Sequence, residues 1–301
     1  MRDPVSAQGA QVSAGGQEDA PGPSADGTGA SPSRAGRDLR AAIGVGVGLG
    51  ALVLAALLVV PKVFVGVVAV AVVISTIELA GALKRGAGIE IALPPVLVGG
   101  QAMVWLSWPF ERSGLLTGFV LTVLACLVWR FRGGVDGYLR DVTASVFTAA
   151  YVPMFAAFAV LLVDPHDGAF RVLCFLIGVV CSDTGGYIAG VLFGKHPMAP
   201  AISPKKSWEG FGGSLVMGMV GGALSVTLLL HGQWWQGALF GAALVLSSTA
   251  GDLVESLIKR DLGIKDMGTL LPGHGGLMDR MDSLLPSAVV AWLLLHLFVP
   301  V

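Results

Sequence analysis

Charged residues are scarce in this chain. Only 13% of its 301 residues are Asp, Glu, Lys or Arg, against about 25% in soluble domains. This scarcity argues against a water-soluble globule, a nucleic-acid-binding protein and a disordered chain. Six windows contain none of these four residue types: 41–61, 91–110, 113–129, 142–163, 210–251 and 283–301. Because about 20 apolar residues cross a bilayer as a helix, we predict an all-α polytopic membrane protein.

Cysteine is almost as rare. The three cysteines, Cys126, Cys174 and Cys181, all lie in apolar parts of the sequence. Their odd number excludes a fully paired disulfide framework, and their spacing matches no metal site. We interpret them as small packing residues.

Residues 1–40 lack aromatic side chains and are rich in Gly, Ala, Ser, Pro and Asp. Such a segment cannot bury a core, so we predict a disordered cytoplasmic tail. The first apolar run begins only near Ala41 and is long enough to span a bilayer, which argues against a cleaved signal peptide.

Beyond the tail we predict nine transmembrane spans. About five belong to an N-terminal region, 41–168, and about four to a C-terminal catalytic region, 169–301. Glycine pairs such as Gly221-Gly222 suit close helix packing in lipid. The predicted spans are 41–60, 63–83, 91–108, 114–129, 143–163, 170–193, 211–230, 235–256 and 284–300.

The distribution of Lys and Arg predicts the orientation. If the tail is cytoplasmic and the spans alternate, only Lys62, Arg112 and Arg171 of the 19 basic residues lie outside. This bias matches the positive-inside rule. It places two long loops, 194–210 and 257–283, on the cytoplasmic face of the cell membrane.

Several acidic residues lie within predicted spans, where a charge costs at least about 2.5 kcal/mol at the centre. Glu78 is in the second span, Asp183 is in the sixth, and Asp252 and Glu255 end the eighth. Each either belongs to a hydrogen-bonded cluster that joins helices or serves function.

The segment from Gly251 to Ser283 combines carboxylates, basic residues and a glycine turn. Helical spacing places Asp252, Glu255 and Lys259 on one face, and Asp279 and Asp282 on another. Grouped carboxylates suit Mg²⁺, which takes phosphates and waters as its other ligands. The turn 272–276, Pro-Gly-His-Gly-Gly, brings backbone N–H groups near an anion. We therefore predict a metal–polyphosphate site.

A second segment, 202–213, carries Lys205 and Lys206 before the seventh span. Ser207 suits the N-cap of the helix and Glu209 its first turn, which would explain both without a ligand. Two lysines at a helix N-terminus oppose the helix dipole, so we favour an anion bound there.

These segments resemble the phosphatidate cytidylyltransferases, also called CDP-diacylglycerol synthases. The resemblance covers residues 181–283, and upstream it rests on hydropathy alone. Gly185-Gly186-Tyr187 departs mildly from the family pattern, and the long tail is not a family feature. The matching runs are Ser182-Asp183-Thr184, then Ser203-Pro204-Lys205-Lys206-Ser207 with Glu209-Gly210, and Ser256-x-x-Lys259-Arg260-x4-Lys265-Asp266-x5-Pro272-Gly273-His274-Gly275-Gly276-x-x-Asp279-Arg280-x-Asp282.

The resemblance implies the reaction of CTP with phosphatidate to give CDP-diacylglycerol and pyrophosphate. It also implies a homodimer, and Mg²⁺ and K⁺ between Asp252 and Asp279. His274 either donates to a phosphate or only forms the turn. We expect catalytic roles for Asp183, Asp252, Lys259, Asp279 and Arg280; metal ligands in Asp252, Glu255, Asp279 and Asp282; and substrate binding by Lys205, Lys206, Ser207, Glu209, Arg260, Lys265, His274, Gly275 and Gly276.

Two other functions fit parts of the sequence. A CTP-dependent polyprenol or dolichol kinase would transfer the γ-phosphate to an alcohol, with Asp183 as a base. An ion-coupled transporter would explain Glu78 and Asp183, but we see no internal repeat with paired broken helices.

Overall fold

The structure, a computed structural model, describes residues 48, 50–59, 61–270 and 275–300. The predicted tail and His274 lie outside the described residues. Those described belong to one compact unit. Within them, seven helices are long and apolar enough to cross a membrane, and the chain is a multi-pass membrane protein.

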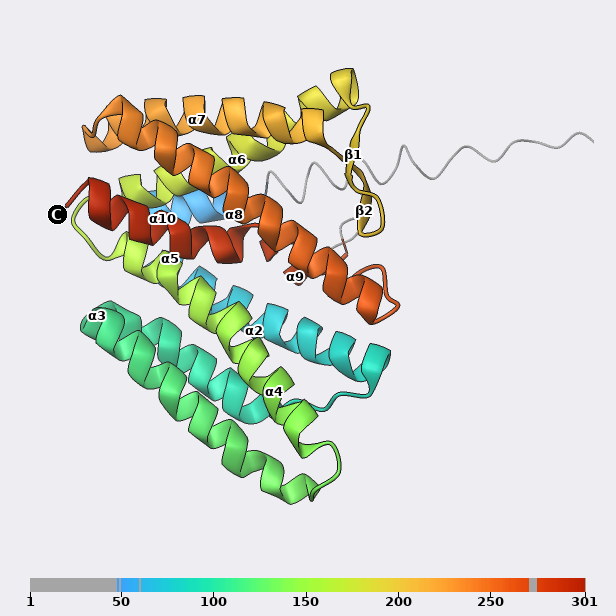
Figure 1. Cartoon of the computed structure of the whole chain (residues 1–301). Helices are drawn as coiled ribbons and strands as arrows, with labels where there is room; N and C mark the ends of the chain where they lie inside the picture. Colours follow the sequence, from blue (N-terminus) through green and yellow to red (C-terminus); the bar gives the residue numbers. More distant parts are fainter. Residues whose placement is uncertain (1–47, 49, 60, 271–274, 301) are drawn as a thin grey trace, which may run out of the picture. The chain divides into compact units, whose positions relative to one another are not determined.

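The chain is mostly helical, with one small sheet (Figure 1). A short apolar helix, Gly50–Val59, comes first. The remaining elements are α2 (Pro61–Ala87), α3 (Leu93–Trp129), η1 (Arg130–Gly133), α4 (Tyr138–Ala149), η2 (Ala150–Met154), α5 (Phe155–Val163), α6 (Gly168–Phe193), β1 (Pro197–Ala199), β2 (Ser203–Ser207), α7 (Trp208–Leu230), α8 (Trp234–Asp261), α9 (Met278–Met281) and α10 (Leu284–Phe298).

Two features separate seven candidate spans from the predicted nine. The predicted spans 91–108 and 114–129 both fall in α3, which Pro109 and a positive φ of 48° at Glu111 divide into two arms. The arms lie side by side in Figure 1, and a Cβ on Gly118 would lie 3.0 Å from Met103 Cγ. The predicted span 41–60 is described only at residues 48 and 50–59. The count of nine therefore stays a prediction.

The predicted loop 194–210 contains a β-hairpin, which corrects the all-α prediction. Strands β1 and β2 pair antiparallel, with Pro197 opposite Ser207 and Ala199 opposite Ser203. The Glu209 carboxylate accepts hydrogen bonds from the backbone N–H groups of Lys195 and His196 at 3.1 and 3.2 Å. Glu209 therefore fixes the base of the hairpin against the start of α7.

Glycine lets α6, α7 and α8 pack with their backbones close together. A Cβ on Gly213 of α7 would lie 2.6 Å from the carbonyl oxygen of Gly185 on α6. On the other side of α7, Gly222 approaches the carbonyl oxygen of Gly237 on α8 in the same way. The sequence prediction of glycine-mediated packing is thus confirmed at Gly221-Gly222, where a Cβ on Gly221 would meet Cys181 Sγ at 2.5 Å.

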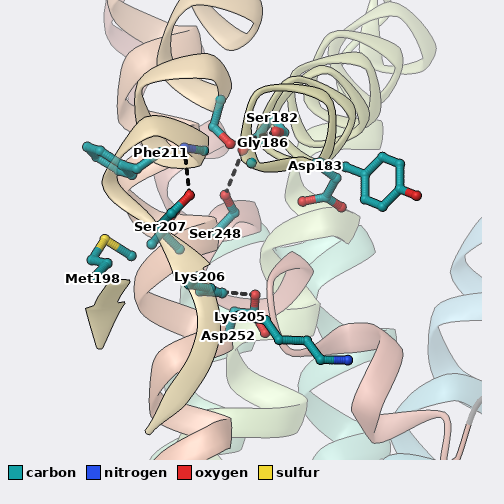
Figure 2. A pocket seen from close by; sticks show the side chains of 15 residues that line it. Ser182, Asp183, Gly186, Met198, Lys205, Lys206, Ser207, Phe211, Ser248 and Asp252 are labelled. Carbon is teal, nitrogen blue, oxygen red and sulfur yellow. Dashed lines mark hydrogen bonds and ion pairs between the residues drawn. The ribbon is translucent and has the colours of Figure 1, made fainter. Parts of the chain in front are cut away.

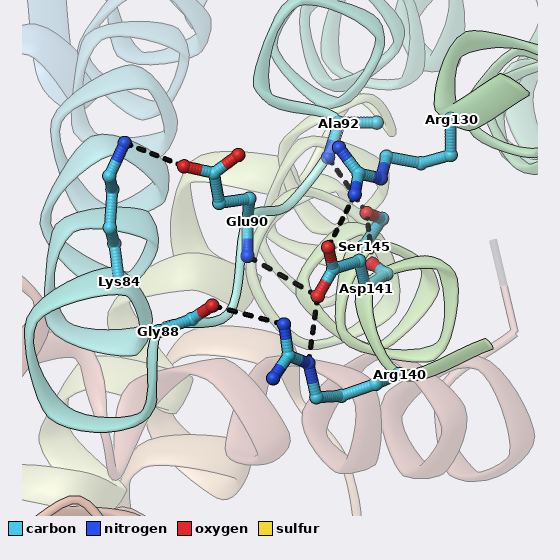
Figure 3. Close-up of polar contacts among 8 residues, drawn as sticks. All are labelled: Lys84, Gly88, Glu90, Ala92, Arg130, Arg140, Asp141 and Ser145. Atoms are coloured by element: carbon cyan, nitrogen blue, oxygen red, sulfur yellow. Dashed lines mark hydrogen bonds and ion pairs between the residues drawn. The ribbon is translucent and has the colours of Figure 1, made fainter. Parts of the chain in front are cut away.

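A polar network joins the first helices at the end that also carries the hairpin in Figure 1 (Figure 3). Asp141 of α4 is only 2% exposed and pairs with Arg130 at 2.5 Å and with Arg140 at 3.0 Å. The backbone N–H of Glu90 also donates to Asp141, at 3.4 Å. Asp141 therefore holds together the α2–α3 connection, the end of α3 and the start of α4.

Candidate functional site

Helix α8 presents the predicted acidic face. It runs to Asp261, beyond the predicted end at residue 256, so the first residues of the predicted loop 257–283 are helical. Glu255 is fully buried, and Lys259 Nζ lies 3.4 Å from its Oε2 one turn later. Asp252, one turn earlier, forms an ion pair with Lys206 of β2. The predicted shared face of Asp252, Glu255 and Lys259 is confirmed at the contact between Glu255 and Lys259.

A polar cavity of about 440 Å³ lies beside this face, and we call it the carboxylate cavity. It collects residues that are up to 100 positions apart in the sequence. Five carboxylates and two basic groups line it, so its protein groups carry an excess of negative charge. The lining residues are Asp183, Asp252, Lys259, Asp266, Asp279, Arg280, Asp282 and Ser283.

Several hydrogen bonds hold the Asp279 carboxylate in this cavity. Lys259 Nζ donates to its Oδ1 at 2.9 Å. The backbone N–H of Met267 donates to Oδ2 at 3.0 Å, and that of Gly276 donates to the same oxygen at 2.8 Å. Gly276 is reached through Gly275, whose φ of 80° favours glycine. Asp279 thereby connects Met267 and Gly276 to Lys259 near the end of α8.

A second cavity of about 360 Å³ lies under β2, between α6, α7 and α8 (Figure 2). We call it the hairpin cavity. Lys205, Lys206 and Ser207 line it from the hairpin, and Tyr187 and Phe211 add aromatic surface. In Figure 2, Lys206 reaches across to Asp252. Asp183 and Asp252 line both cavities, so the cavities meet at these two carboxylates.

Not all of the predicted binding residues line a cavity. Ser207 accepts a hydrogen bond from the Gly210 N–H at 3.1 Å, as its predicted N-cap role requires, and also lines the hairpin cavity. Glu209 binds the hairpin backbone, and Arg260 Nε donates to the Ile202 carbonyl at 3.4 Å. Lys265 is exposed and lines neither cavity.

No three Asp, Glu, His or Cys side chains among the described residues converge to form a metal site by themselves. The chemistry of the carboxylate cavity nevertheless suits a hard cation, because Mg²⁺ keeps waters and takes phosphate oxygens as ligands. Of the predicted metal ligands, Asp252, Asp279 and Asp282 line the cavity. Glu255 lies outside its lining. Among the described residues, neither of its buried carboxylate oxygens has a hydrogen-bond donor, although Lys259 Nζ is an ion-pair partner at 3.4 Å.

Sequence reasoning assigned no role to several lining residues. Asp266 and Ser283 line the carboxylate cavity, and Ser248 and Thr249 line the hairpin cavity. The sequence could have indicated a role for Asp266, because it directly follows Lys265 in the motif. Ser248 and Thr249 sit in an uncharged window and give no signal that distinguishes them from helix-packing residues.

Comparisons with known proteins show the family to which the chain is similar. The model of the cytidylyltransferase family matches residues 40–298. A phosphatidate cytidylyltransferase of Mycobacterium bovis is 54% identical over 278 residues, which cover 88% of this chain and 90% of the relative. One from Mycobacterium leprae is 53% identical over 88% and 89% of the two chains. One from Haemophilus influenzae is 41% identical over 40% and 44%.

Proposed function

The chain belongs to the cytidylyltransferase family, and on this premise we propose how its residues carry out the reaction. The activity is cytidylyl transfer from CTP to phosphatidate, because the relatives that match most of its length are phosphatidate cytidylyltransferases. A phosphate oxygen of the lipid bonds to the α-phosphorus of CTP. The bond between that phosphorus and the bridging oxygen breaks, and pyrophosphate leaves with CDP-diacylglycerol as the other product.

One observation supports a division of the site between two substrates: the two cavities share Asp183 and Asp252. A reaction that joins two phosphate groups needs both held beside one another at a fixed angle. We assign the carboxylate cavity to the triphosphate and the hairpin cavity to the lipid phosphate. The α-phosphorus then lies where the cavities meet.

The carboxylate cavity suits the triphosphate only together with cations. Its carboxylates outnumber its basic groups, Lys259 and Arg280, and would repel a polyphosphate. Bound Mg²⁺, with K⁺ as a possible second ion, would supply the missing positive charge. Asp252 and Asp279 would hold Mg²⁺, with Asp183, Asp282 and Glu255 as further ligands or supports. We assign to Lys259 and Arg280 the neutralisation of charge that develops on the leaving pyrophosphate.

The hairpin cavity suits the lipid. Lys205 and Lys206 supply positive charge for its phosphate, and Tyr187 is 73% exposed on the outer surface of α6. The phosphate of phosphatidate is already a competent nucleophile at neutral pH, so the site needs no residue that removes a proton. Positioning and charge neutralisation are the work left to the protein.

We further propose nine spans, a cytoplasmic N-terminus, a homodimer and an active site that faces the cytoplasm of the cell. The basic residues support this orientation. Figure 1 shows the ends of α2, α6 and α8 and the starts of α4 and α7 on the side of the hairpin. Lys84 and Lys259 lie near the ends of α2 and α8, Arg130 directly follows α3, and Lys205 lies in β2 just before α7. Labelling of single introduced cysteines from either side of sealed vesicles tests the orientation.

Asp279→Asn tests the site. Asparagine removes the negative charge and turns an NH₂ group toward Lys259 or the Gly276 N–H, so we expect kcat to fall roughly 100-fold or more. Purified protein with CTP labelled at the α-phosphate, phosphatidate and Mg²⁺ provides the assay, with label in the extracted lipid as the readout. Asp261→Asn is the matched control, because Asp261 ends α8 and lines neither cavity.

Wild-type activity in Asp279→Asn would contradict its assignment. A chelator should abolish wild-type activity and added Mg²⁺ restore it. In parallel, an assay with γ-labelled CTP and a polyprenol distinguishes the lipid-kinase alternative from cytidylyl transfer. Label transferred to polyprenol, with none entering lipid from α-labelled CTP, would replace the cytidylyltransferase mechanism with a kinase mechanism.

A further inference from the structure

One face of α2 packs against the segment that carries Asp279. Ser75 Oγ donates to Met281 Sδ at 3.2 Å, and Arg85 Nη2 donates to the Met267 carbonyl at 3.0 Å. A Cβ on Gly86 would lie 2.7 Å from Leu262 Cβ, so the backbones also approach closely there. The contacting residues of α2 follow helical spacing. This N-terminal helix therefore packs against the C-terminal segment that carries Asp279, although it lines neither cavity.

Glu78 lies at the centre of that face. Its Oε2 accepts a hydrogen bond from the backbone N–H of Met278 at 2.8 Å. A Cβ on Gly276 would lie 2.5 Å from the same oxygen, and a Cβ on Gly268 would clash with Oε1. The carboxylate thus fills the space that two glycines leave open. Among the described residues, no hydrogen-bond donor reaches its buried Oε1, so the Met278 N–H is the donor that fixes the carboxylate.

Glu78 and Asp279 contact the same two stretches of chain, at residues 267–268 and at 276–279. Asp279 accepts from the N–H groups of Met267 and Gly276. Glu78 lies against Gly276 and against Gly268, the residue after Met267. It also accepts from Met278, the residue before Asp279. Movement of the Glu78 carboxylate would therefore displace Gly268 and Gly276, which lie beside or carry the N–H groups that hold Asp279.

We propose that Glu78 is a positioning residue that holds Gly268, Gly276 and Asp279 in place against the triphosphate. The proposal rests on the proposed division of the site, in which the carboxylate cavity binds CTP. Glu78 itself lines neither cavity, so it acts through Met278, Gly268 and Gly276. Its role requires an acceptor oxygen of the right reach, and does not require a negative charge.

Two substitutions at Glu78 separate reach from charge. Glu78→Gln keeps an oxygen that accepts from Met278, and we expect kcat and the KM for CTP to stay within about threefold of wild type. Glu78→Ala removes the acceptor and opens space, and we expect kcat/KM for CTP to fall at least about tenfold, since small misplacements cost this much. The KM for phosphatidate should change less than the KM for CTP. Gly66→Ala on the same helix, where an added Cβ meets nothing within 4 Å, is the control.

Gly268→Ala tests the same contact from the other side. The added methyl displaces the Glu78 carboxylate, so its effect should resemble that of Glu78→Ala. In the double variant, which combines Glu78→Ala with Gly268→Ala, the methyl added at position 268 occupies the space that the carboxylate has left. We expect the loss of kcat/KM for CTP to stay within about twofold of the larger single loss, because the effects of coupled residues are not additive. Melting temperatures in detergent, measured for every variant, show which proteins are folded.

Equal damage by Glu78→Gln and Glu78→Ala would overturn the proposal in favour of a role for charge. Wild-type kinetics in Glu78→Ala, or losses that multiply in the double variant, would also overturn it. If Glu78→Ala does not fold, Glu78→Gln and Gly268→Ala decide by the same criteria. Absence of CDP-lipid with wild-type protein would instead refute the proposed function, and the two failures are therefore distinguishable.

Discussion

Lys205 and Lys206 are neighbours with different surroundings. Lys206 is paired with Asp252, and its side chain is 25% exposed. Lys205 is exposed, lines the hairpin cavity and forms no ion pair among the described residues. The helix-dipole argument for a bound anion therefore applies with less force to Lys206, which the protein already neutralises. Lys205 is the charge that remains available to a phosphate.

We expect Lys205→Gln to raise the KM for phosphatidate roughly tenfold and to change the KM for CTP less. A hydrogen bond to a charged group contributes about 1.5–3 kcal/mol, of which an amide can replace part. Steady-state kinetics in mixed micelles, with each substrate varied in turn, measures both constants. Lys195→Gln is the control, because Lys195 is exposed and lines neither cavity. A selective rise in the KM for CTP would exchange the assignments of the two cavities.

At the scale of the element, the site depends on how closely α6, α7 and α8 pack. Gly213 of α7 faces α6, where an added Cβ would clash with Ala189 Cβ and lie 2.6 Å from the Gly185 carbonyl oxygen. Its neighbour Gly212 faces open space, with nothing within 4 Å of an added Cβ. Two adjacent glycines thus have opposite tolerance for a side chain.

Gly213→Ala should destabilise the protein by about 1–3 kcal/mol, because the methyl group forces apart two packed helices. Gly212→Ala should leave stability unchanged or raise it slightly, since alanine favours the helix over glycine. Thermal unfolding in detergent, followed by far-ultraviolet circular dichroism, compares the two. A Gly213→Ala protein as stable as wild type would show that α6 and α7 are not packed this closely.

The helices were more predictable than the hairpin. Uncharged windows locate α7, α8 and α10, because a bilayer demands a long apolar helix. The predicted span 170–193 matches α6, although that helix contains Arg171 and Asp183. Residues 197–207 show no alternation of apolar and polar side chains, so no strand signal exists there. Contacts from other elements hold the hairpin, including Glu209 from α7 and Arg260 from α8.

For the whole molecule, the Asp141 network holds the end of α2 in place relative to α3 and α4. Removing one partner of a buried charge pair leaves the others uncompensated and costs about 3–5 kcal/mol. We therefore expect Asp141→Asn to lower the midpoint of thermal unfolding strongly. Glu90→Gln is the control, because Lys84 and Glu90 pair at 2.8 Å with both side chains more than half exposed, and such pairs contribute at most about 1 kcal/mol. Equal midpoints for the two variants would contradict a central role for Asp141.

The sequence predicts the parts of the site that lie close together in the chain, and it does not predict contacts between distant segments. Residues 181–283 carry motif spacing that predicts most of the carboxylate cavity, and Asp183, Asp252, Asp279 and Asp282 do meet there. Glu78 contacts a residue 200 positions away, and no local pattern connects the two. Its two interpretations could be compared only when the helices were placed together.

The ion pair between Lys206 and Asp252 has a consequence for the order of events. A lipid phosphate that draws Lys206 away leaves Asp252 uncompensated and better able to hold a cation. A cation on Asp252 would in turn release Lys206 toward a phosphate. Because such coupling is reciprocal, we expect the cation that accompanies CTP and the lipid phosphate to strengthen each other's binding by the same factor. With CTP alone the site would be incompletely assembled, which would disfavour hydrolysis of CTP.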